Sequence, residues 1–415
     1  MSQPTAVDVE APISGTTSTW PADQIRNFAS IGTGAKDTQD RNQTGRYPFF
    51  VRSQKIERID SWSFDGEAVL TAGDGVGTGK VFHYINGRFD YHQRVYRISN
   101  FRSDVSGKYF FYQFSRNFLA RIESLTAKSS VDSVRMETIA GMEIPLPPRI
   151  EQDRIVDAID DAQALIMTLE RLIAKKQLVK QGMMQQLLTG KTRLPGFRGE
   201  WRKVRFANLG RCIRGVAYNP DLDLAPTATS ETIELLRSNN IKDSQIILNN
   251  VQHVQRRRVK DDQLLKLDDI MICMANGSKQ LVGKAARFSQ KGPIQFTFGA
   301  FMAAFRVYPS VANPPYVYYC FQTKAFRDWI GMILAGSSIN NLRPRDIEGY
   351  AMELPDLEEQ KAIANSLIDA DAEIDALVRR LDQARLIKNG MMQELLTGRT
   401  RLDLGIESKL GGNES

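Results

Sequence analysis

Two long stretches of the chain carry apolar residues at alternating spacings of about four and three positions. Each series includes one alanine, Ala162 in the first stretch and Ala370 in the second. The remaining apolar positions are Ile155, Ile159, Ile166, Leu169 and Ile173 in the first stretch, and Ile363, Leu367, Ile374, Leu377 and Leu381 in the second. This spacing is typical of a coiled-coil seam. The sequence therefore predicts two long α-helices that each carry one narrow apolar stripe.

The residues that flank these stretches indicate where the helices begin and end. Both stretches follow a Leu-Pro step, which disfavours helix at the residue before proline, and both then turn acidic, as a helix N-terminus prefers. Gly190 and Gly398 stand where a helix C-cap is expected, and basic residues follow them. We expect the first helix to run from about residue 151 to 189, which makes it about 58 Å long at ~1.5 Å per residue.

The two stretches are copies of one another. The run Leu187 to Leu194 returns as Leu395 to Leu402, 208 positions further along, and the match extends upstream without a gap. From residue 146 to 194, roughly half of the positions are identical to their partners at 354–402, and chance does not produce this in an ungapped run. The chain is therefore a tandem duplication, and each long helix has its own duplicate as the nearest candidate for a packing partner.

Shorter patterns between the helices predict mixed α/β domains with irregular sheets. Runs rich in β-branched and aromatic residues are separated by Gly, Asn and Asp turns. We expect strands at 68–71, 94–98, 245–248, 270–272 and 296–298, and helices from Tyr109 to about Leu125 and from Tyr316 to Leu334. Two short motifs also repeat in order: residues 50–53 parallel residues 235–238, and residues 78–81 parallel residues 282–285.

These elements predict an alternation of two globular domains with two helices. The expected segments are a disordered tail at 1–19, a first domain at 20–145, a helix at 146–194, a second domain at 195–353, a helix at 354–402 and a tail at 403–415. If the helices pack antiparallel, they form a coiled coil with approximate two-fold pseudosymmetry and one domain at each end. Such a rod of roughly 60 Å would act as a ruler between two related but unequal domains.

Composition narrows the class of protein only moderately. The chain has 415 residues and a formal net charge of +7, which favours an anionic partner without proving one. The three cysteines, Cys212, Cys273 and Cys320, are scattered, so neither a disulfide framework nor a zinc site is implied, and we expect a reducing compartment. The first residues lack the basic and apolar run of a signal peptide, and no stretch approaches ~20 apolar residues, so we expect a cytoplasmic protein.

The helix motifs resemble those of a known family, the specificity subunits of type I restriction-modification enzymes. The run from Leu188 to Phe197, followed by Trp201, looks like that family's junction between its first helix and its second recognition domain. The Leu-Pro steps with Glu151-Gln152 and Glu359-Gln360 look like its helix entries. The resemblance covers about residues 20–402, with specific motifs in the helices and weak ones in the domains. The first domain departs most from the family pattern.

The resemblance implies a protein that recognises DNA without a catalytic centre of its own. Each domain, as a target-recognition domain, would read one half of a bipartite target in double-stranded DNA. The helices would set the spacing and dock methyltransferase subunits, two of them by expectation, and restriction and translocase subunits would join the complex. S-adenosylmethionine, ATP and Mg are expected on those partners, and no cofactor is expected on this chain.

Arginine, lysine and small polar residues that follow predicted strands are candidates for DNA contacts. Arg and Gln suit the edges of guanine and adenine in the major groove, and Lys suits phosphate. In the first domain the candidates are Arg52, Ser53, Gln54, Lys55, Thr78, Lys80, His83, His92 and Arg94. In the second domain they are Arg237, Ser238, Asn239, Asn240, Arg256, Arg257, Arg258, Lys260, Asn276, Ser278, Lys279 and Lys284. A solvated surface loop explains the Arg256–Arg258 cluster about equally well.

Two other hypotheses remain open at this level. The tetrapeptide Asn313 to Tyr316 matches the catalytic signature of amino-group DNA methyltransferases, so the chain could be a self-contained adenine-N6 methyltransferase. An Asn-Pro pair is also an ordinary helix start, and no glycine-rich cofactor loop accompanies it. The chain could instead be a protein-binding scaffold that uses its helices as a strut. The glycine run up to Gly79-Lys80 lacks the spacing of a P-loop, and the three histidines favour no metal site.

Overall fold

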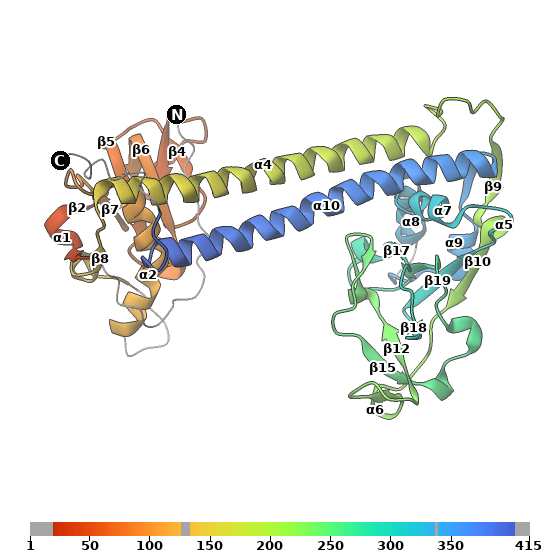
Figure 1. Ribbon diagram of the computed structural model, residues 1–415. Helices are drawn as coiled ribbons and strands as arrows, with labels where there is room; N and C mark the ends of the chain where they lie inside the picture. Colours follow the sequence, from red (N-terminus) through yellow and green to blue (C-terminus); the bar gives the residue numbers. More distant parts are fainter. Residues whose placement is uncertain (1–19, 126–132, 337–338, 403–415) are drawn as a thin grey trace, which may run out of the picture. The chain divides into compact units, whose positions relative to one another are not determined.

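The computed structural model describes residues 20–125, 133–336 and 339–402 (Figure 1), and the two expected tails lie outside this part of the chain. By its internal contacts, the chain divides into two units. Unit 1 consists of the residues up to Glu170 together with those from Arg380 onward, and unit 2 consists of residues 171–379. Each unit therefore joins one globular region to a part of both long helices.

The two predicted long helices are α4 (Arg149–Leu187) and α10 (Leu357–Leu395), each of 39 residues. The predicted seam residues are buried except Ala162, Ala370 and Leu377, which are partly exposed. In unit 1, Gln163 and Glu170 of α4 pair with Lys388 and Arg385 of α10. In unit 2, Lys176 and Lys180 of α4 pair with Glu373 and Asp371 of α10. Rising numbers on α4 meet falling numbers on α10, which confirms that the helices are antiparallel within each unit.

Unit 1 is built on a six-stranded sheet that the helix α2 (Gly107–Leu125) covers. In spatial order the strands are β2 (Ser30–Thr33), β7 (Val95–Ser99), β5 (Phe64–Ala72), β6 (Phe82–Tyr91), β3 (Tyr47–Phe50) and β4 (Glu57–Ile59). Only the pair β3 and β6 is parallel. The short strands β1 (Ala22–Gln24) and β8 (Glu143–Pro145) pair separately, beside the short helices α1 (Ile25–Phe28) and α3 (Met136–Ala140). Aromatic residues of α2 form the core with α4 and the last turns of α10.

Unit 2 repeats this plan with two smaller sheets. One has the order β10 (Gly210–Arg214), β19 (Met302–Val307), β16 (Ile270–Cys273), β17 (Ala285–Arg287). The other has the order β11 (Leu224–Ala225), β15 (Gln252–Gln255), β12 (Thr232–Leu236), β18 (Phe296–Phe298). Two further pairs of strands are antiparallel. They are β9 (Arg202–Arg205) with β20 (Ala351–Leu354), and β13 (Ile241–Lys242) with β14 (Gln245–Ile246). The short helices are α5 (Phe206–Leu209), α6 (Pro220–Asp223) and α9 (Pro344–Glu348).

Two elements that are continuous in unit 1 are divided in unit 2. In unit 1, the single strand β6 pairs with both β5 and β3. In unit 2, two separate strands make the equivalent pairs: β17 pairs with β16, and β18 pairs with β12. The prediction of one continuous helix from Tyr316 to Leu334 is wrong. This segment forms two helices, α7 (Pro314–Cys320) and α8 (Lys324–Ala335). Thr323 adopts an extended conformation and accepts a hydrogen bond from the Phe326 amide, so it caps a new helix. The strand expected at 245–248 ends at Ile246.

None of the described helices has a stretch that is long and apolar enough to cross a membrane. The three cysteines are unpaired thiols, and burial raises the pKa of Cys212 to about 12. The described residues contain no group of three or more side chains placed to hold a metal ion.

Candidate nucleic-acid interface

Three loops of unit 1 meet at one edge of its sheet, which we call the first edge (residues 51–55, 73–78 and 92–94). Backbone hydrogen bonds join the loops: the His92 amide donates to Phe50, and the Gly73 amide donates to the Arg94 carbonyl. Asp74 then pairs with two guanidinium groups, Arg52 at 2.9 Å and Arg94 at 3.5 Å. Both arginines remain about half exposed or more. The edge therefore presents two oriented arginines on a fixed backbone.

Three loops of unit 2 meet in the same way at the second edge (residues 237–240, 274–281 and 299–301). The Gly299 amide donates to Leu236 at 3.0 Å, and the Met274 amide donates to the Phe301 carbonyl at 2.8 Å. The Asn276 amide group also lies 3.5 Å from the Ser238 hydroxyl. The two backbone bonds match those of the first edge, so the two units hold equivalent loops with different side chains.

The hydrogen bonds and two glycines fix how the two edges correspond. Gly79 and Gly283 both have positive φ, +68° and +80°, and a Cβ at either would press on the neighbouring helix α2 or α8. This confirms the predicted parallel of residues 78–81 with 282–285. The parallel of residues 50–53 with 235–238 is wrong by one position, since Phe50 and Leu236 make the equivalent bonds to His92 and Gly299. The Gly73 amide donates to Arg94 as the Met274 amide donates to Phe301, so Arg94 corresponds to Phe301. Asp74 follows Gly73 and therefore corresponds to Ala275, which follows Met274.

Several predicted contact residues lie on or next to the two edges and are open to solvent. They are Arg52, Ser53, Gln54, Lys55, Lys80 and Arg94 in unit 1, and Asn239, Ser278 and Lys279 in unit 2, with Arg237, Ser238 and Asn276 partly exposed. Some are already engaged by the chain: Lys55 pairs with Glu57, and Gln54 donates to the Lys80 carbonyl. Phe301 was not predicted, because a single aromatic residue in a turn carries no sequence signal for DNA.

Other predicted contact residues are buried or, like Lys284, partly buried. Thr78, His83, His92 and Asn240 are each at most 4% exposed. The Asn240 side chain donates to the Ile247 and Asn249 carbonyls, and the Lys284 ammonium donates to the Ile241 carbonyl. Their predicted role as direct contacts is therefore at odds with the structure. Because strand neighbours determine burial, the sequence pattern alone does not reveal it.

His92 supports the first edge from within. Burial, followed by the charge of Arg52, lowers the pKa of His92, so the ring is neutral near pH 7. Its Nδ1 accepts a hydrogen bond from the Arg94 amide at 2.9 Å. Burial also lowers the pKa of His83, whose Nε2 lies 3.0 Å from the Ser53 carbonyl. Both histidines therefore position the backbone of loops that carry exposed cations.

The basic cluster Arg256–Arg258 lies apart from the second edge. The antiparallel register places Gln255 opposite Thr232, at the end of β12 remote from Arg237. At ~3.4 Å per residue, the two ends of β12 are about 14 Å apart. Arg257 and Arg258 pair with the buried Asp223, and Arg256 pairs with the exposed Asp261, so all three arginines already have an acidic partner in the chain. Lys260 follows this cluster and is exposed.

Each long helix enters its unit through the duplicated Glu-Gln pair. The buried Glu359 accepts two hydrogen bonds from Arg193 and one from the Trp201 indole, and Arg193 lies over the Trp201 ring. The buried Glu151 accepts the same two bonds from Arg401, which lies over Trp20. Gly190 and Gly398 have positive φ and lie against these two tryptophan rings. Of the basic residues expected to serve the helix ends, Arg193 and Arg401 therefore bind a glutamate of the other helix, whereas Arg399 pairs with Glu394 of its own helix.

The adjacent glutamines account for the Asn-Pro-Pro-Tyr tetrapeptide. Gln360 accepts a hydrogen bond from the Asn313 amide at 2.9 Å, as Gln152 does from the Ser106 amide at 2.8 Å. The Asn313 side chain caps α7 by accepting from the Tyr316 amide, and Tyr316 is fully buried. Both residues are committed to the start of α7, which supports the helix-start interpretation.

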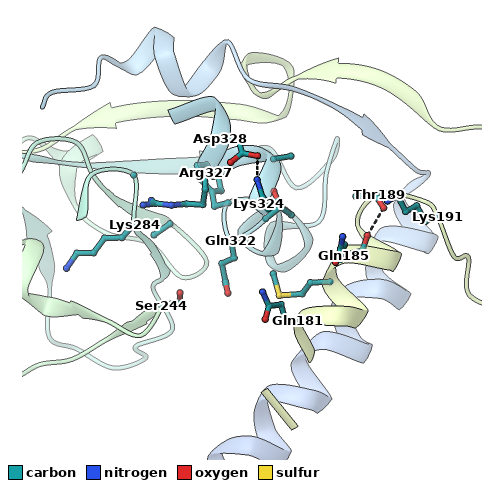
Figure 2. Close-up of a pocket in the computed structure, with 16 residues that line it drawn as sticks. Gln181, Gln185, Thr189, Lys191, Ser244, Lys284, Gln322, Lys324, Arg327 and Asp328 are labelled. Atoms are coloured by element: carbon teal, nitrogen blue, oxygen red, sulfur yellow. Dashed lines mark hydrogen bonds and ion pairs between the residues drawn. The ribbon is translucent and has the colours of Figure 1, made fainter. Parts of the chain in front are cut away.

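A cavity of about 650 Å³ lies in unit 2 between the last turns of α4 and the start of α8 (Figure 2). Three of its cationic side chains already have partners. Lys324 pairs with Asp328 at 2.6 Å, Lys284 donates to the Ile241 carbonyl, and Arg327 donates to the carbonyls of Gln280 and Val282. The cavity is therefore a weaker candidate for contact with phosphate than the second edge.

Comparison with known proteins shows which family part of the chain resembles. The model of the "Type I restriction modification DNA specificity domain" matches residues 17–181. The StySPI specificity subunit of Salmonella potsdam is 31% identical over 196 residues, 47% of this chain and 42% of the relative. The EcoKI specificity subunit of Escherichia coli (strain K12) is 30% identical over 198 residues, 48% of this chain and 42% of the relative. The matched part thus spans less than half the length of these two relatives.

A solved structure extends the likeness to nearly the whole chain. The S subunit of a type I restriction-modification system from M. genitalium superposes with a TM-score of 0.61 at 14% identity, over 92% of this chain and 97% of the other. At that identity the likeness shows the fold alone.

Proposed function

We propose that the chain is a specificity subunit of a type I restriction-modification system and recognises a bipartite target in double-stranded DNA. Residues 17–181 match the family's domain model, and the relatives that resemble about half of the chain are specificity subunits. The observation that carries the proposal is the pair of equivalent edges, each built from three loops on a fixed backbone. Loops with an equivalent backbone but different side chains suit two half-sites of different sequence. In this proposal α4 and α10 set the spacing between the halves, and the chain contributes recognition but no chemistry.

The side chains of the first edge suit direct readout of bases. A guanidinium group with free N–H donors recognises guanine through O6 and N7. Asp74 restrains Arg52 and Arg94 in their orientations, which lowers the entropy lost when they bind DNA. Exposed Lys55 and Lys80 flank them and suit phosphate oxygens. The first edge therefore combines one pair of candidate base readers with candidate backbone contacts.

The experiment assembles the full chain with its methyltransferase subunits and maps the methylated sequence. We expect Arg94→Ala to weaken binding about 10-fold and to relax one position in one half of the target only, since one bidentate contact is worth ~1–3 kcal/mol of discrimination. Arg257→Ala, at the remote end of β12, is the matched control and leaves both halves unchanged. Loss of all sequence preference, or a wild-type complex that binds DNA without a steep dependence on salt, contradicts the proposal.

We also propose that α4 and α10 dock two methyltransferase subunits at equivalent surfaces. The first docking patch is Leu178, Val179 and Gly182 on α4, and the second is Leu386, Ile387 and Gly390 on α10. The four aliphatic side chains are between 50% and 71% exposed, and the two sets occupy duplicated positions. Isolated exposed apolar residues are common, but the same exposed set on both helices indicates that one partner binds twice.

The glycines show what kind of contact the patches suit. Gly182 and Gly390 lie inside helices, where glycine costs about 1 kcal/mol relative to alanine. A Cβ at either position would meet no atom within 4 Å, so packing within the described chain does not require glycine there. A partner helix that approaches closely does require a small residue. The patches therefore suit an apolar helix of the methyltransferase subunit.

Enlarging the glycines tests this docking contact. We expect Gly182→Leu together with Gly390→Leu to raise the free energy of unfolding by about 0.5–1 kcal/mol per site, because leucine favours helix. We expect the same variant to bind methyltransferase subunits at least 10-fold more weakly, measured by titration in an ultracentrifuge. The alanine pair is the control, since it adds the helix stability with little bulk. Unchanged assembly in the leucine variant would show that no partner approaches these positions.

A further inference from the structure

The two edges differ at a matched pair of positions, and the difference changes their chemistry. Where the first edge carries the ion pair of Asp74 and Arg94, the second edge carries Ala275 and Phe301. A charged pair in one unit is thus an apolar pair in the other, on equivalent backbone. The exchange replaces a hydrogen-bonding surface with an apolar one at the same place in the fold.

Phe301 is displayed to solvent although its neighbours are buried. Its side chain is 71% exposed, whereas the next residue, Met302, is 1% exposed. The Phe301 carbonyl accepts hydrogen bonds from the amides of Met274 and Ala275, at 2.8 and 3.2 Å, so the backbone of the turn is held in place. The ring therefore projects from a rigid turn and does not belong to any of the three hydrophobic clusters described in unit 2.

The surroundings of Phe301 are polar groups suited to base edges. Asn276 and Ser238 lie on the other two loops, and the Arg237 Cγ would lie 4.0 Å from a Cβ if Gly299 carried one. In the major groove of DNA, the apolar group presented by a base is the C5 methyl of thymine. An exposed ring among hydrogen-bonding side chains matches an A·T pair, which offers that methyl beside donors and acceptors.

We propose that Phe301 reads the methyl group of a thymine in the half-site bound by unit 2. This inference rests on the proposed recognition of DNA and names one specificity-determining contact within it. Arg94 and Phe301 occupy equivalent positions on the shared backbone of the two edges. In this proposal, that position selects a polar base edge in unit 1 and a methyl group in unit 2.

Removing the methyl group tests the contact directly. Once the methylated motif of the wild-type complex is mapped, each thymine of the target is replaced in turn by deoxyuridine, which lacks only the C5 methyl. We expect one such replacement to weaken binding of the wild-type complex about 5- to 10-fold. We expect Phe301→Ala to weaken binding of the thymine duplex by a similar factor, and to bind the thymine and deoxyuridine duplexes equally.

Two controls separate this inference from the proposed function. Phe301→Leu keeps an apolar contact and should retain part of the discrimination. Leu222→Ala, at a similarly exposed apolar residue of α6 outside both edges, should leave it unchanged. If wild-type binding has no sequence preference, the proposed function fails. If wild-type binding is specific but no deoxyuridine position couples to Phe301, or Phe301→Ala weakens all duplexes alike, the methyl contact is wrong and the recognition proposal stands.

Discussion

A protein carrying both Ile166→Asp and Ile374→Asp is expected to lose most of its helical signal at temperatures where the wild type is folded. The two side chains are 6% and 8% exposed in the seam between α4 and α10, in unit 1 and unit 2 respectively. Removing a buried isoleucine costs ~2–5 kcal/mol, and a carboxylate in its place must be desolvated or protonated. A loss of about 4 kcal/mol in each unit is comparable with the whole stability of many domains, ~5–15 kcal/mol.

Urea unfolding followed by circular dichroism at 222 nm measures this loss. The matched control is Ala174→Asp with Ala376→Asp, which adds the same charges to the same helices at exposed positions. Its cost should stay below about 1 kcal/mol per site, the range of helix propensity. A double isoleucine variant that unfolds at the wild-type urea concentration would show that the seam contributes little.

Replacing Leu178 and Leu386 together with glutamate is expected to reduce methylation by the assembled complex at least 100-fold. Both side chains lie outside the seam, at 69% and 71% exposure, so the free energy of unfolding of the free chain should change by less than about 0.5 kcal/mol. In an apolar interface, an unpaired carboxylate costs ~3 kcal/mol or more, which is a factor of about 100 in affinity. The expected result is a stable chain that fails to recruit its partner.

The single variants make this prediction sharper. Because the patches are duplicated, Leu178→Glu and Leu386→Glu should each leave one methyltransferase subunit bound, as measured by the mass of the purified complex. Gln177→Glu is the control, since it places the same charge on α4 about 100° around the helix from Leu178. Two subunits bound to either single leucine variant would rule out docking at that patch.

The long helices were predictable because their signals are local. Apolar spacing, acidic first turns and terminal glycines act within one or two turns, and α4 begins at Arg149, within two residues of the expected start at about residue 151. The broken helix around Gln322 was missed for the same reason: a Thr323 cap is compatible with the sequence of a continuous helix, and only packing selects the break.

The candidate site was predictable as loops that follow strands, but not as a set of exposed side chains. Arg52 and Arg94 were predicted individually, whereas their common partner Asp74 was not. Thr78, His83 and Asn240 have the same chemistry as surface contacts, but neighbouring strands and loops cover them. The contact between Arg193 and Glu359 joins residues 166 positions apart, and no local pattern encodes such a separation.

The sequence by itself determined that the chain is duplicated, that each copy ends in a long helix with one apolar stripe, and that polar loops follow β-rich runs. These properties depend on residue order over short distances, where periodicity and capping act. Only the tertiary structure decided which loops meet, which polar side chains are buried, and that Ala275 with Phe301 occupies the place of Asp74 with Arg94. Those outcomes depend on strand register and on contacts between distant residues, which the folded backbone alone brings together.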